Sequence, residues 1–360
     1  MYFHIDQDTG AYISGWVICD NPGDTPEILV RASGRKELAL TANVFRPDLR
    51  DLGMHSTGQA GFVVDERHVP DLHQLNDITL IESETGITIY KRFNASDHIE
   101  RKLLLVDSSA FPQIALVRQL MSFFTQSYPV LERLSLETIT GLLSLTNIKS
   151  AFLTGSMNWI RHGEIARDNG FVTAALLREP FAELAEKLIF LTHATRQSEN
   201  VRASPTIARF ADLLPYLEDL DFRNSRSILS ALRRIPNEGR KKLQSPMTML
   251  FGTAPDERVQ RRNVSVALDN LAKFNVVGLR NHFDLFCGML NEYVEAPIAS
   301  GLELSGFAEV EELAERLRNI GIASDLLDED IALYSYAVEA IEESLQKTDD
   351  PGQVSSDTSK

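Results

Sequence analysis

The sequence predicts an α/β domain with a mostly parallel sheet, preceded by a small all-β domain. Residues 1–95 contain short runs rich in β-branched and aromatic residues, with turn-forming residues between them. Beyond Asn94-Ala95-Ser96-Asp97, near-continuous apolar runs alternate with stretches of helical periodicity, which is the pattern of parallel strands covered on both faces. The length of 360 residues also favours two domains.

The composition excludes several classes of protein. Hydrophobic residues make up 43% and charged residues 24%, as in ordinary globular proteins. The formal net charge of −15 disfavours non-specific binding to nucleic acid, because an acidic surface repels phosphates. Cys19 and Cys287 form no CxxC pattern, and no HExxH motif occurs, so we expect reduced thiols and no metal site. No signal peptide and no apolar run of about 20 residues is recognised, which favours a cytoplasmic protein without a transmembrane segment.

The all-β prediction rests on short runs and on the turn residues that separate them. Ser33-Gly34 and Glu84-Thr85-Gly86 are turn signals, and the second lies between two β-branched runs, as in a hairpin. Trp16 is expected in the core, with a sugar-stacking position as the alternative. We therefore expect a sandwich over residues 1–95 with strands at Tyr12–Ile18, Glu27–Ala32, Leu38–Ala42, Gly61–Val64, Ile78–Glu82 and Ile87–Phe93.

The α/β prediction covers residues 100–345. Pro112 precedes a stretch of helical periodicity and suits the first turn of a helix, where a missing N–H costs nothing. Further helices are predicted at Phe307–Ile320 and Asp328–Leu345, and the polar residues 346–360 are predicted to form a disordered tail. The strands are expected at Leu103–Val106, Ala151–Leu153, Phe171–Leu177 and Asn275–Leu279.

Four segments of this second part resemble, in order, segments of carbohydrate sulfotransferases of the heparan sulfate 2-O type and their bacterial relatives. Leu176-Leu177-Arg178-Glu179-Pro180 resembles an "LRDP" element of that family. The resemblance implies a P-loop-like sulfotransferase fold and transfer of a sulfuryl group from the nucleotide PAPS to a hydroxyl. The other similar segments are Lys102–Leu105 with the helix after it, Ala267–Leu279 and Asp328–Tyr334.

The loop that would hold the 5′-phosphosulfate departs from the family pattern. In the family it reads like "HIPKTAGTS", and its amides, lysine and hydroxyls form an anion nest. The aligned stretch here begins Asp107-Ser108-Ser109-Ala110, with Ala110 at the lysine position. Pro112 removes an amide donor, and Asp107 brings a negative charge to the place of a phosphate. Phe111 and Pro112 could also plug the loop.

The other functional positions depart as well. Arg178 is retained for the 3′-phosphate, but Glu183 and Glu186 stand where the family has an arginine and then a serine. Ser156 stands where the family has its histidine base, and serine needs its own activator to act as one. His162 is the candidate for a displaced base, with an ordinary surface histidine as the alternative.

A basic cluster contrasts with the acidic background. One interpretation is a binding site for an anionic glycan or nucleotide, because guanidinium groups pair well with carboxylate, sulfate and phosphate. The alternative is a set of solvated helix faces. The cluster comprises Arg233, Arg234, Arg240, Lys241, Lys242, Arg258, Arg261 and Arg262.

These patterns lead to three functional hypotheses. Ile13–Val17, Val44–Leu49 and Gly58–Phe62 resemble a β module found ahead of bacterial glycosyltransferases and sulfotransferases, which suggests surface-polysaccharide biosynthesis. The first hypothesis is a pseudoenzyme without a cofactor, which binds an anionic glycan or a polysaccharide-assembly enzyme. The second is an active carbohydrate sulfotransferase, or another glycan-modifying transferase, that holds PAPS in a site rebuilt around Arg178 and the basic cluster. The third is a structural interaction protein that uses its β part as the contact surface.

Overall fold

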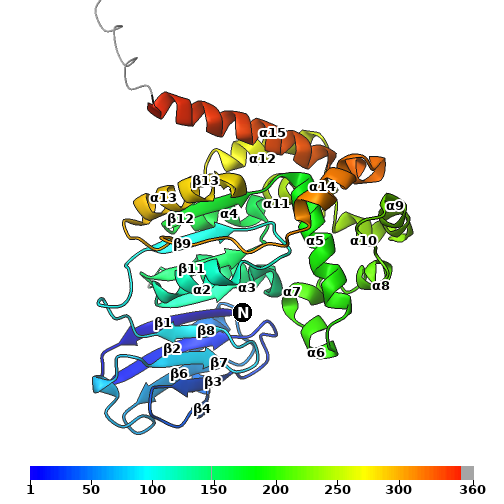
Figure 1. Ribbon diagram of the computed structural model, residues 1–360. Helices are drawn as coiled ribbons and strands as arrows, with labels where there is room; N and C mark the ends of the chain where they lie inside the picture. Colours follow the sequence, from blue (N-terminus) through cyan, green and yellow to red (C-terminus); the bar gives the residue numbers. More distant parts are fainter. Residues whose placement is uncertain (147, 350–360) are drawn as a thin grey trace, which may run out of the picture.

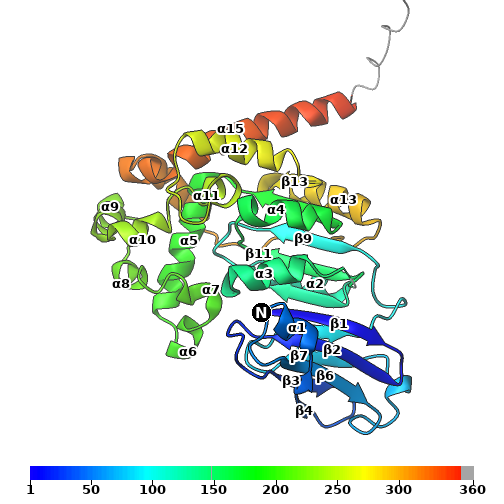
Figure 2. The same ribbon diagram turned by 180° about the vertical axis from the view of Figure 1, so that it is seen from behind.

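The computed structural model describes residues 1–146 and 148–349 and shows a mixed α/β protein (Figures 1 and 2). It contains one five-stranded sheet, in which all strands are parallel, and two four-stranded antiparallel sheets. The predicted combination of a parallel sheet with an all-β part is therefore confirmed. Within the described residues, no helix is both long and apolar enough to cross a bilayer.

The antiparallel sheets are formed by the N-terminal part of the chain. One has the order β1-β2-β6-β5 and the other the order β4-β3-β7-β8. Each predicted run in this part coincides with a strand, while β1 and β5 were not predicted. The strands are β1 (Tyr2–Asp8), β2 (Tyr12–Ile18), β3 (Glu27–Arg31), β4 (Leu38–Thr41), β5 (Val44–Phe45), β6 (Gln59–Asp65), β7 (Thr79–Glu82) and β8 (Thr88–Lys91).

The core of this β part is continuous with the core of the parallel sheet. Phe3 and Val17 from one antiparallel sheet and Ile28 from the other belong to the same buried cluster as Leu104 and Ile139 of the α/β part. The hydroxyl of Tyr128 also donates to the Thr88 carbonyl, at 2.7 Å, across the junction. The β part and the α/β part therefore share one buried core.

The parallel sheet has the order β10-β11-β9-β12-β13. Its central strand, β9, is the one that comes first in the chain. Four of its strands were predicted, and β10 was not. Strands β9 and β12 are near-continuously buried because helices cover both faces, as apolar runs of this kind require. The strands are β9 (Lys102–Val106), β10 (Gln126–Pro129), β11 (Ala151–Gly155), β12 (Phe171–Leu177) and β13 (Val276–Leu279).

The helices divide between the faces as right-handed crossovers demand. The connection from β9 to β10 runs in one direction along the sheet, and its helix α2 shares a buried cluster with α13. The later connections run in the opposite direction, and α3, α4 and α12 pack on the other face. These helices are α2 (Ile114–Ser122), α3 (Leu136–Leu143), α4 (Trp159–Asp168), α12 (Arg262–Leu271) and α13 (Phe283–Val294).

A helical lobe lies beside the sheet, with its own buried cluster (right side of Figure 1). Its central element is the 16-residue helix α5, which packs against α8 and α14. The remaining helices are α1 (Pro47–Asp51), α5 (Pro180–Thr195), α6 (Glu199–Arg202), α7 (Pro205–Ala208), α8 (Leu214–Leu217), α9 (Ser225–Arg234), α10 (Asn237–Lys241), α11 (Pro246–Gly252), α14 (Val310–Arg318) and α15 (Gly321–Asp349).

Several predicted helix boundaries differ from the structure, including those of Phe307–Ile320, where α14 spans Val310–Arg318. Pro112 lies outside α2, whose N-cap is Gln113, so it does not occupy the first helical turn. The helix predicted to start at Asp328 begins at Gly321 and continues to Asp349, so residues 346–349 extend α15 where a tail was expected. The rest of the predicted tail, residues 350–360, lies outside the described part of the chain.

Candidate functional site

The candidate site lies at the carboxyl edge of the parallel sheet. Helix α2, after β9, covers one face, whereas helix α4, after β11, covers the other, so a crevice opens where these strands end. A polar side chain follows each strand at this edge. In strand order along the sheet they are Glu132, Ser156, Asp107, Arg178 and Arg280.

Arg178, the residue predicted to hold a 3′-phosphate, is paired with a carboxylate of its own chain. Glu186 of α5 is 1% exposed and forms ion pairs with both Arg178 and Arg280. Arg280 Nη1 lies 2.8 Å from Glu186 Oε2, and both arginine side chains are largely buried. We interpreted Glu186 as a group that repels a phosphate; the structure shows that it neutralises the guanidinium groups that would attract one.

Helix α5 brings its acidic residues to this edge because it starts directly after β12. Pro180 occupies its first turn, and the Glu179 side chain accepts the Ala182 N–H at 2.7 Å as an N-cap. Glu183, Glu186 and Lys187 are spaced by three and four residues, so they lie on one face. All three side chains are buried on the inward face of the helix.

The loop after β9 is also bonded within the protein. The Ala110 N–H donates to Glu183 Oε1 at 3.3 Å, and the Ser109 N–H donates to Asp107 Oδ1 at 2.8 Å. In an anion nest these amides would point at a phosphate. Here a glutamate from α5 and the loop's own aspartate accept them. Asp107, Ser109 and Ala110 thus lie together at the edge as predicted, next to Arg280 and away from the basic cluster.

The carboxyl of Asp107 keeps its proton to a higher pH than an ordinary aspartate does. Burial raises the pKa of its carboxyl to about 6, and the nearby negative charges of Glu183 and Glu132 act in the same direction. The Ser109 N–H and the positive charge of Arg280 oppose this rise. An additional anion at this position would be repelled by Asp107 whenever that carboxyl is ionised.

Glu132, which follows β10, is another carboxylate that binds donors of the protein at this edge. Its carboxylate accepts the Ser156 N–H at 3.0 Å and lies 3.1 Å from Arg209 Nη1. Val130, directly before the turn that carries Glu132, has a left-handed backbone with a φ of 60°. Ser156 thus lies at the end of β11 as predicted, but its amide serves a glutamate.

We predict that Gly155→Ala disturbs this part of the site and destabilises the protein. Gly155 has a φ of 139°, which side chains rarely tolerate, and an added Cβ would lie 2.5 Å from the Leu131 backbone nitrogen. The expected loss is about 1–3 kcal/mol in the free energy of unfolding, measured by urea denaturation. Gly170→Ala, at a left-handed glycine with no atom near the added Cβ, is the control for backbone strain alone. Equal losses in both variants would contradict close packing at Gly155.

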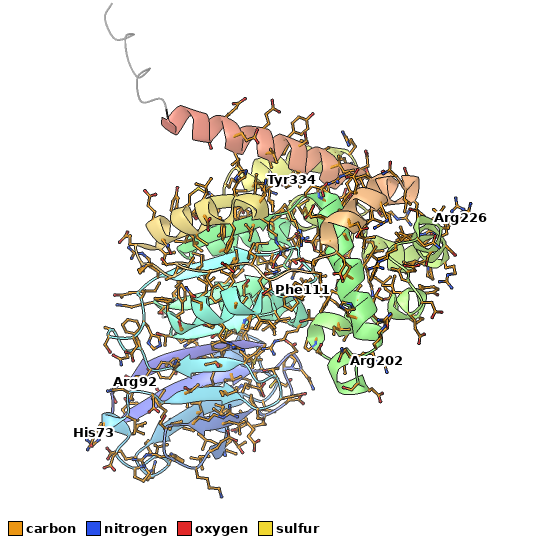
Figure 3. All side chains as sticks on the ribbon, in the orientation of Figure 1. His73, Arg92, Phe111, Arg202, Arg226 and Tyr334 are labelled. Atoms are coloured by element: carbon orange, nitrogen blue, oxygen red, sulfur yellow. The ribbon has the colours of Figure 1, made fainter. Side chains whose placement is uncertain are left out.

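A small pocket remains at this edge. Its volume is about 300 Å³, at the lower limit of small-molecule sites, and Pro112, Val117 and Met121 give it a mostly apolar wall. Arg178 and Arg280 do not line it. Phe111, labelled in Figure 3, does not fill the loop as a plug. Its ring centre lies 4.8 Å from that of Phe307 and 5.6 Å from that of Phe190, both in the helical lobe.

His162, the candidate for a displaced base, is enclosed within the protein. It lies on α4 and is fully buried, so the alternative of a surface histidine is wrong as well. Its two ring nitrogens face the carbonyl oxygens of Asn158 and Leu136, at 3.1 and 3.2 Å. Burial lowers its pKa, which favours the neutral ring. A ring enclosed in this way contacts no acceptor hydroxyl.

The predicted basic cluster is divided by the structure. Arg233 and Arg258 line a cleft of about 1110 Å³ between α9, α10 and the start of α15. Arg261 instead pairs with Asp328, at 3.2 Å, and Arg262 pairs with Glu257. The other cationic residues that line this cleft are Arg226, Arg240 and Lys241. Arg234 and Lys242, which the sequence also placed in the cluster, do not line it.

The sequence patterns did not predict three residues of the carboxyl-edge site, namely Arg280, Glu132 and Arg209. Arg280 directly follows the predicted strand at Asn275–Leu279, so strand topology could have placed it at the edge. Glu132 and Arg209 lie in segments without a clear pattern, and no sequence signal indicated that they meet.

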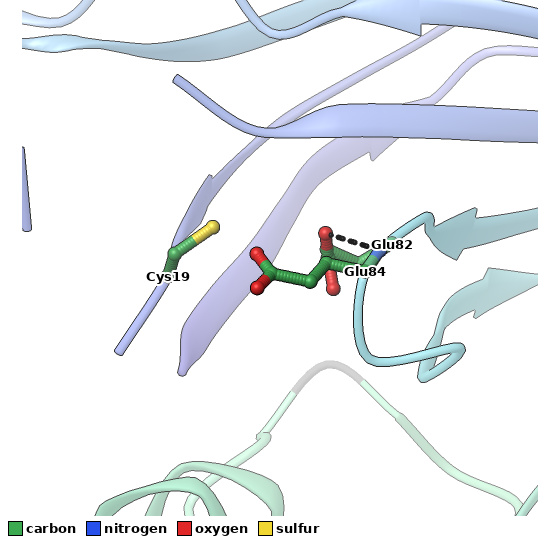
Figure 4. Close-up of side chains that lie close together, drawn as sticks. All are labelled: Cys19, Glu82 and Glu84. Carbon is green, nitrogen blue, oxygen red and sulfur yellow. Dashed lines mark hydrogen bonds between the residues drawn. The ribbon is translucent and has the colours of Figure 1, made fainter. Parts of the chain in front are cut away.

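A group of potential metal ligands exists within the described residues, at Cys19, Glu82 and Glu84 (Figure 4). Glu82 is already used by its hairpin, because it accepts the N–H groups of Glu84 and Thr85 at 3.0 and 2.8 Å. Burial, together with the neighbouring carboxylates, raises the pKa of the Cys19 thiol to about 11. Without a bound cation, the Cys19 thiol therefore stays protonated at neutral pH, and the Glu82 carboxylate serves its hairpin.

Known proteins add no further constraint. No protein-family model matches the chain, and no curated protein matches it. The sulfotransferase resemblance therefore rests on the ordered sequence segments, and the functional proposal rests on the geometry of the carboxyl edge.

Proposed function

We propose that the chain is a sulfotransferase-like binding protein without PAPS-dependent activity. Its role would be to bind an acidic glycan, or an enzyme that handles one, in bacterial surface-polysaccharide biosynthesis. One observation carries the proposal: the groups at the carboxyl edge that could bind a phosphosulfate are bonded to carboxylates of the same chain. Glu186 pairs with Arg178 and Arg280, Glu183 accepts the Ala110 amide, and Glu132 accepts the Ser156 amide and pairs with Arg209.

Electrostatics makes displacement of these carboxylates by a cofactor unfavourable. A phosphosulfate group would approach Asp107, Glu132 and Glu183, and two like charges about 4 Å apart repel by about 4 kcal/mol at an effective dielectric constant near 20. If it displaced Glu186 instead, that buried carboxylate would lose both of its arginine partners. Either route costs free energy that binding must offset.

The active-transferase alternative receives less support from the same geometry. A rebuilt donor site needs Arg178 to line a cavity together with the basic cluster. Arg178 lines neither the edge pocket nor the cleft that contains Arg233 and Arg258. The histidine that could act as a displaced base is enclosed in α4. The sulfotransferase-like scaffold itself is supported by the central position of β9 in a parallel sheet, followed by a loop and helix α2.

The proposal is tested by titrating the protein calorimetrically with PAP, the desulfated cofactor, at moderate salt. We expect no heat of binding at millimolar ligand. An active carbohydrate sulfotransferase in the same buffer is the positive control for the ligand. Micromolar affinity, near about −8 kcal/mol, would overturn the proposal and favour the transferase alternative.

A further inference from the structure

The cleft between α9, α10 and the start of α15 is the largest concavity described above, with a volume of about 1110 Å³. It lies in the helical lobe, near Arg226 on α9 at the right of Figure 3. Its cationic lining comes from separate segments. Arg226 and Arg233 belong to α9, Arg240 and Lys241 to α10, and Arg258 to the loop before α12.

Several of these cations have no acidic partner. In the part of the chain that the structure describes, Arg226, Arg233 and Arg258 have no carboxylate within 4.0 Å, unlike Arg178, Arg209 and Arg280 at the sheet edge. The cleft lining contains five cations (Arg226, Arg233, Arg240, Lys241 and Arg258) and three carboxylates (Asp256, Glu257 and Asp325), so it carries a net positive charge in a protein whose formal net charge is −15. A concave site with this charge attracts anions.

Arg240 also has unused hydrogen-bonding capacity. Its Nη2 donates to the Arg233 carbonyl at 2.7 Å, whereas its buried Nε has no partner. The first turn of the 29-residue helix α15, at Gly321 and Ile322, borders the same cleft, and the leading amides of a helix favour an anion. Residues of α9, α10 and the first turn of α15 thus border one volume.

The amide and carboxylate side chains of the lining indicate a ligand with hydroxyl groups. Asn237, Gln244 and Asn319 present amide groups that can both donate and accept, and the carboxylates of Asp256 and Asp325 can accept from hydroxyls. A simple phosphate would use the arginines alone, and the cleft volume exceeds the range of about 300–1,000 Å³ that suits small ligands. An extended chain of acidic sugars uses both kinds of group.

We infer that this cleft binds an acidic oligosaccharide, whose carboxylate or sulfate groups pair with Arg226, Arg233 and Arg258 while the amide side chains bind its hydroxyls. This inference rests on the proposed glycan-binding function and assigns it a site. It places the ligand in the helical lobe, away from the carboxyl edge where a sulfotransferase cofactor would lie.

The test compares variants of the full-length chain in titrations with a hexamer of galacturonic acid and with a heparin hexasaccharide. Arg233→Gln/Arg258→Gln should weaken binding of at least one of these ligands about tenfold or more, because two charge-assisted contacts are lost. Arg234→Gln is the matched control, since Arg234 neighbours Arg233 on the same helix, is exposed and does not line the cleft. It should leave the affinity unchanged. Circular dichroism verifies that each variant is folded.

Other outcomes would overturn the inference in distinguishable ways. Binding of pyrophosphate as tight as that of the hexasaccharides would point to a phosphate site, and equal binding of neutral maltohexaose would exclude recognition of charge. An equal loss in Arg234→Gln would mean non-specific attraction to a basic surface. If neither oligosaccharide nor PAP binds, only the cleft assignment fails. If PAP binds at micromolar affinity, the proposed function fails first.

Discussion

Glu186→Gln is expected to lower the free energy of unfolding by about 3–5 kcal/mol, the typical cost of breaking a buried ion pair by removing one partner. The substitution leaves Arg178 and Arg280 close together in a largely buried position without their shared carboxylate. Arginine stays charged at any pH at which the protein is folded, so neither group can escape by losing a proton. The variant therefore keeps two uncompensated positive charges at the carboxyl edge.

Urea denaturation of the wild type and the variant measures this loss. Glu312→Gln is the matched control, because Glu312 also pairs with an arginine, Arg316, but its side chain is 62% exposed. An exposed pair of this kind contributes at most about 1 kcal/mol. If Glu186→Gln costs no more than this control, Glu186 does not neutralise the two buried arginines.

The same variant tests why the site would reject a cofactor. If Glu186 occupies the place of an anion, its removal creates an anion site, and sulfate should stabilise Glu186→Gln more than it stabilises the wild type. Binding to the folded state raises the midpoint of thermal unfolding with ligand concentration. An equal response of both proteins to sulfate, compared with chloride at matched ionic strength, would contradict a carboxylate that stands in for a bound anion.

Much of the architecture could be predicted because buried parallel strands leave a clear signal. The apolar run Phe171–Leu177 coincides with β12, and the run before Asp107 coincides with β9 to within one residue. Strand β10 was missed because Gln126-Ser127-Tyr128-Pro129 carries no apolar run. It lies at the edge of the sheet, where Pro129 is tolerated.

The candidate site could be located from the sequence, but its bonding could not. Placing Asp107, Ser156 and Arg178 at one edge requires only that each follows a parallel strand. The pairing of Arg178 with Glu186 depends on where α5 starts and on how it packs, which spacing alone does not fix. The sequence presented Glu183 and Glu186 as repulsive groups, whereas packing turns them into partners for the amide and guanidinium groups of the site.

The segment Asp328–Tyr334, which carries part of the sulfotransferase resemblance, contains a second buried carboxylate with a structural role. Asp330 of α15 is 1% exposed and accepts the N–H groups of Met247 and Thr248, at 3.0 and 2.7 Å, at the start of α11. Asp330→Ala leaves both donors buried and unsatisfied. We expect a loss of about 2–6 kcal/mol in the free energy of unfolding, since each of the two buried donors costs about 1–3 kcal/mol. Asp330→Asn retains an acceptor oxygen and should cost less; equal losses in urea denaturation would contradict the capping role.

Asp330 also makes the stability of the protein depend on pH. Burial raises the pKa of its carboxyl from 3.8 to about 6, although the backbone N–H groups and the charge of the buried Lys187 oppose the rise. The folded state then binds the proton more tightly than the unfolded state, so this carboxyl contributes most stability below pH 3.8 and loses its contribution as the pH rises to about 6. The loss is on the order of 3 kcal/mol. The side chain introduced in Asp330→Asn does not titrate, so the free energy of unfolding of this variant relative to the wild type should increase between about pH 4 and 7. Asp107 also titrates in this range, but it is present in both proteins, so its effect on their difference cancels. A difference between the two proteins that stays constant over this range would show that Asp330 titrates as an ordinary aspartate.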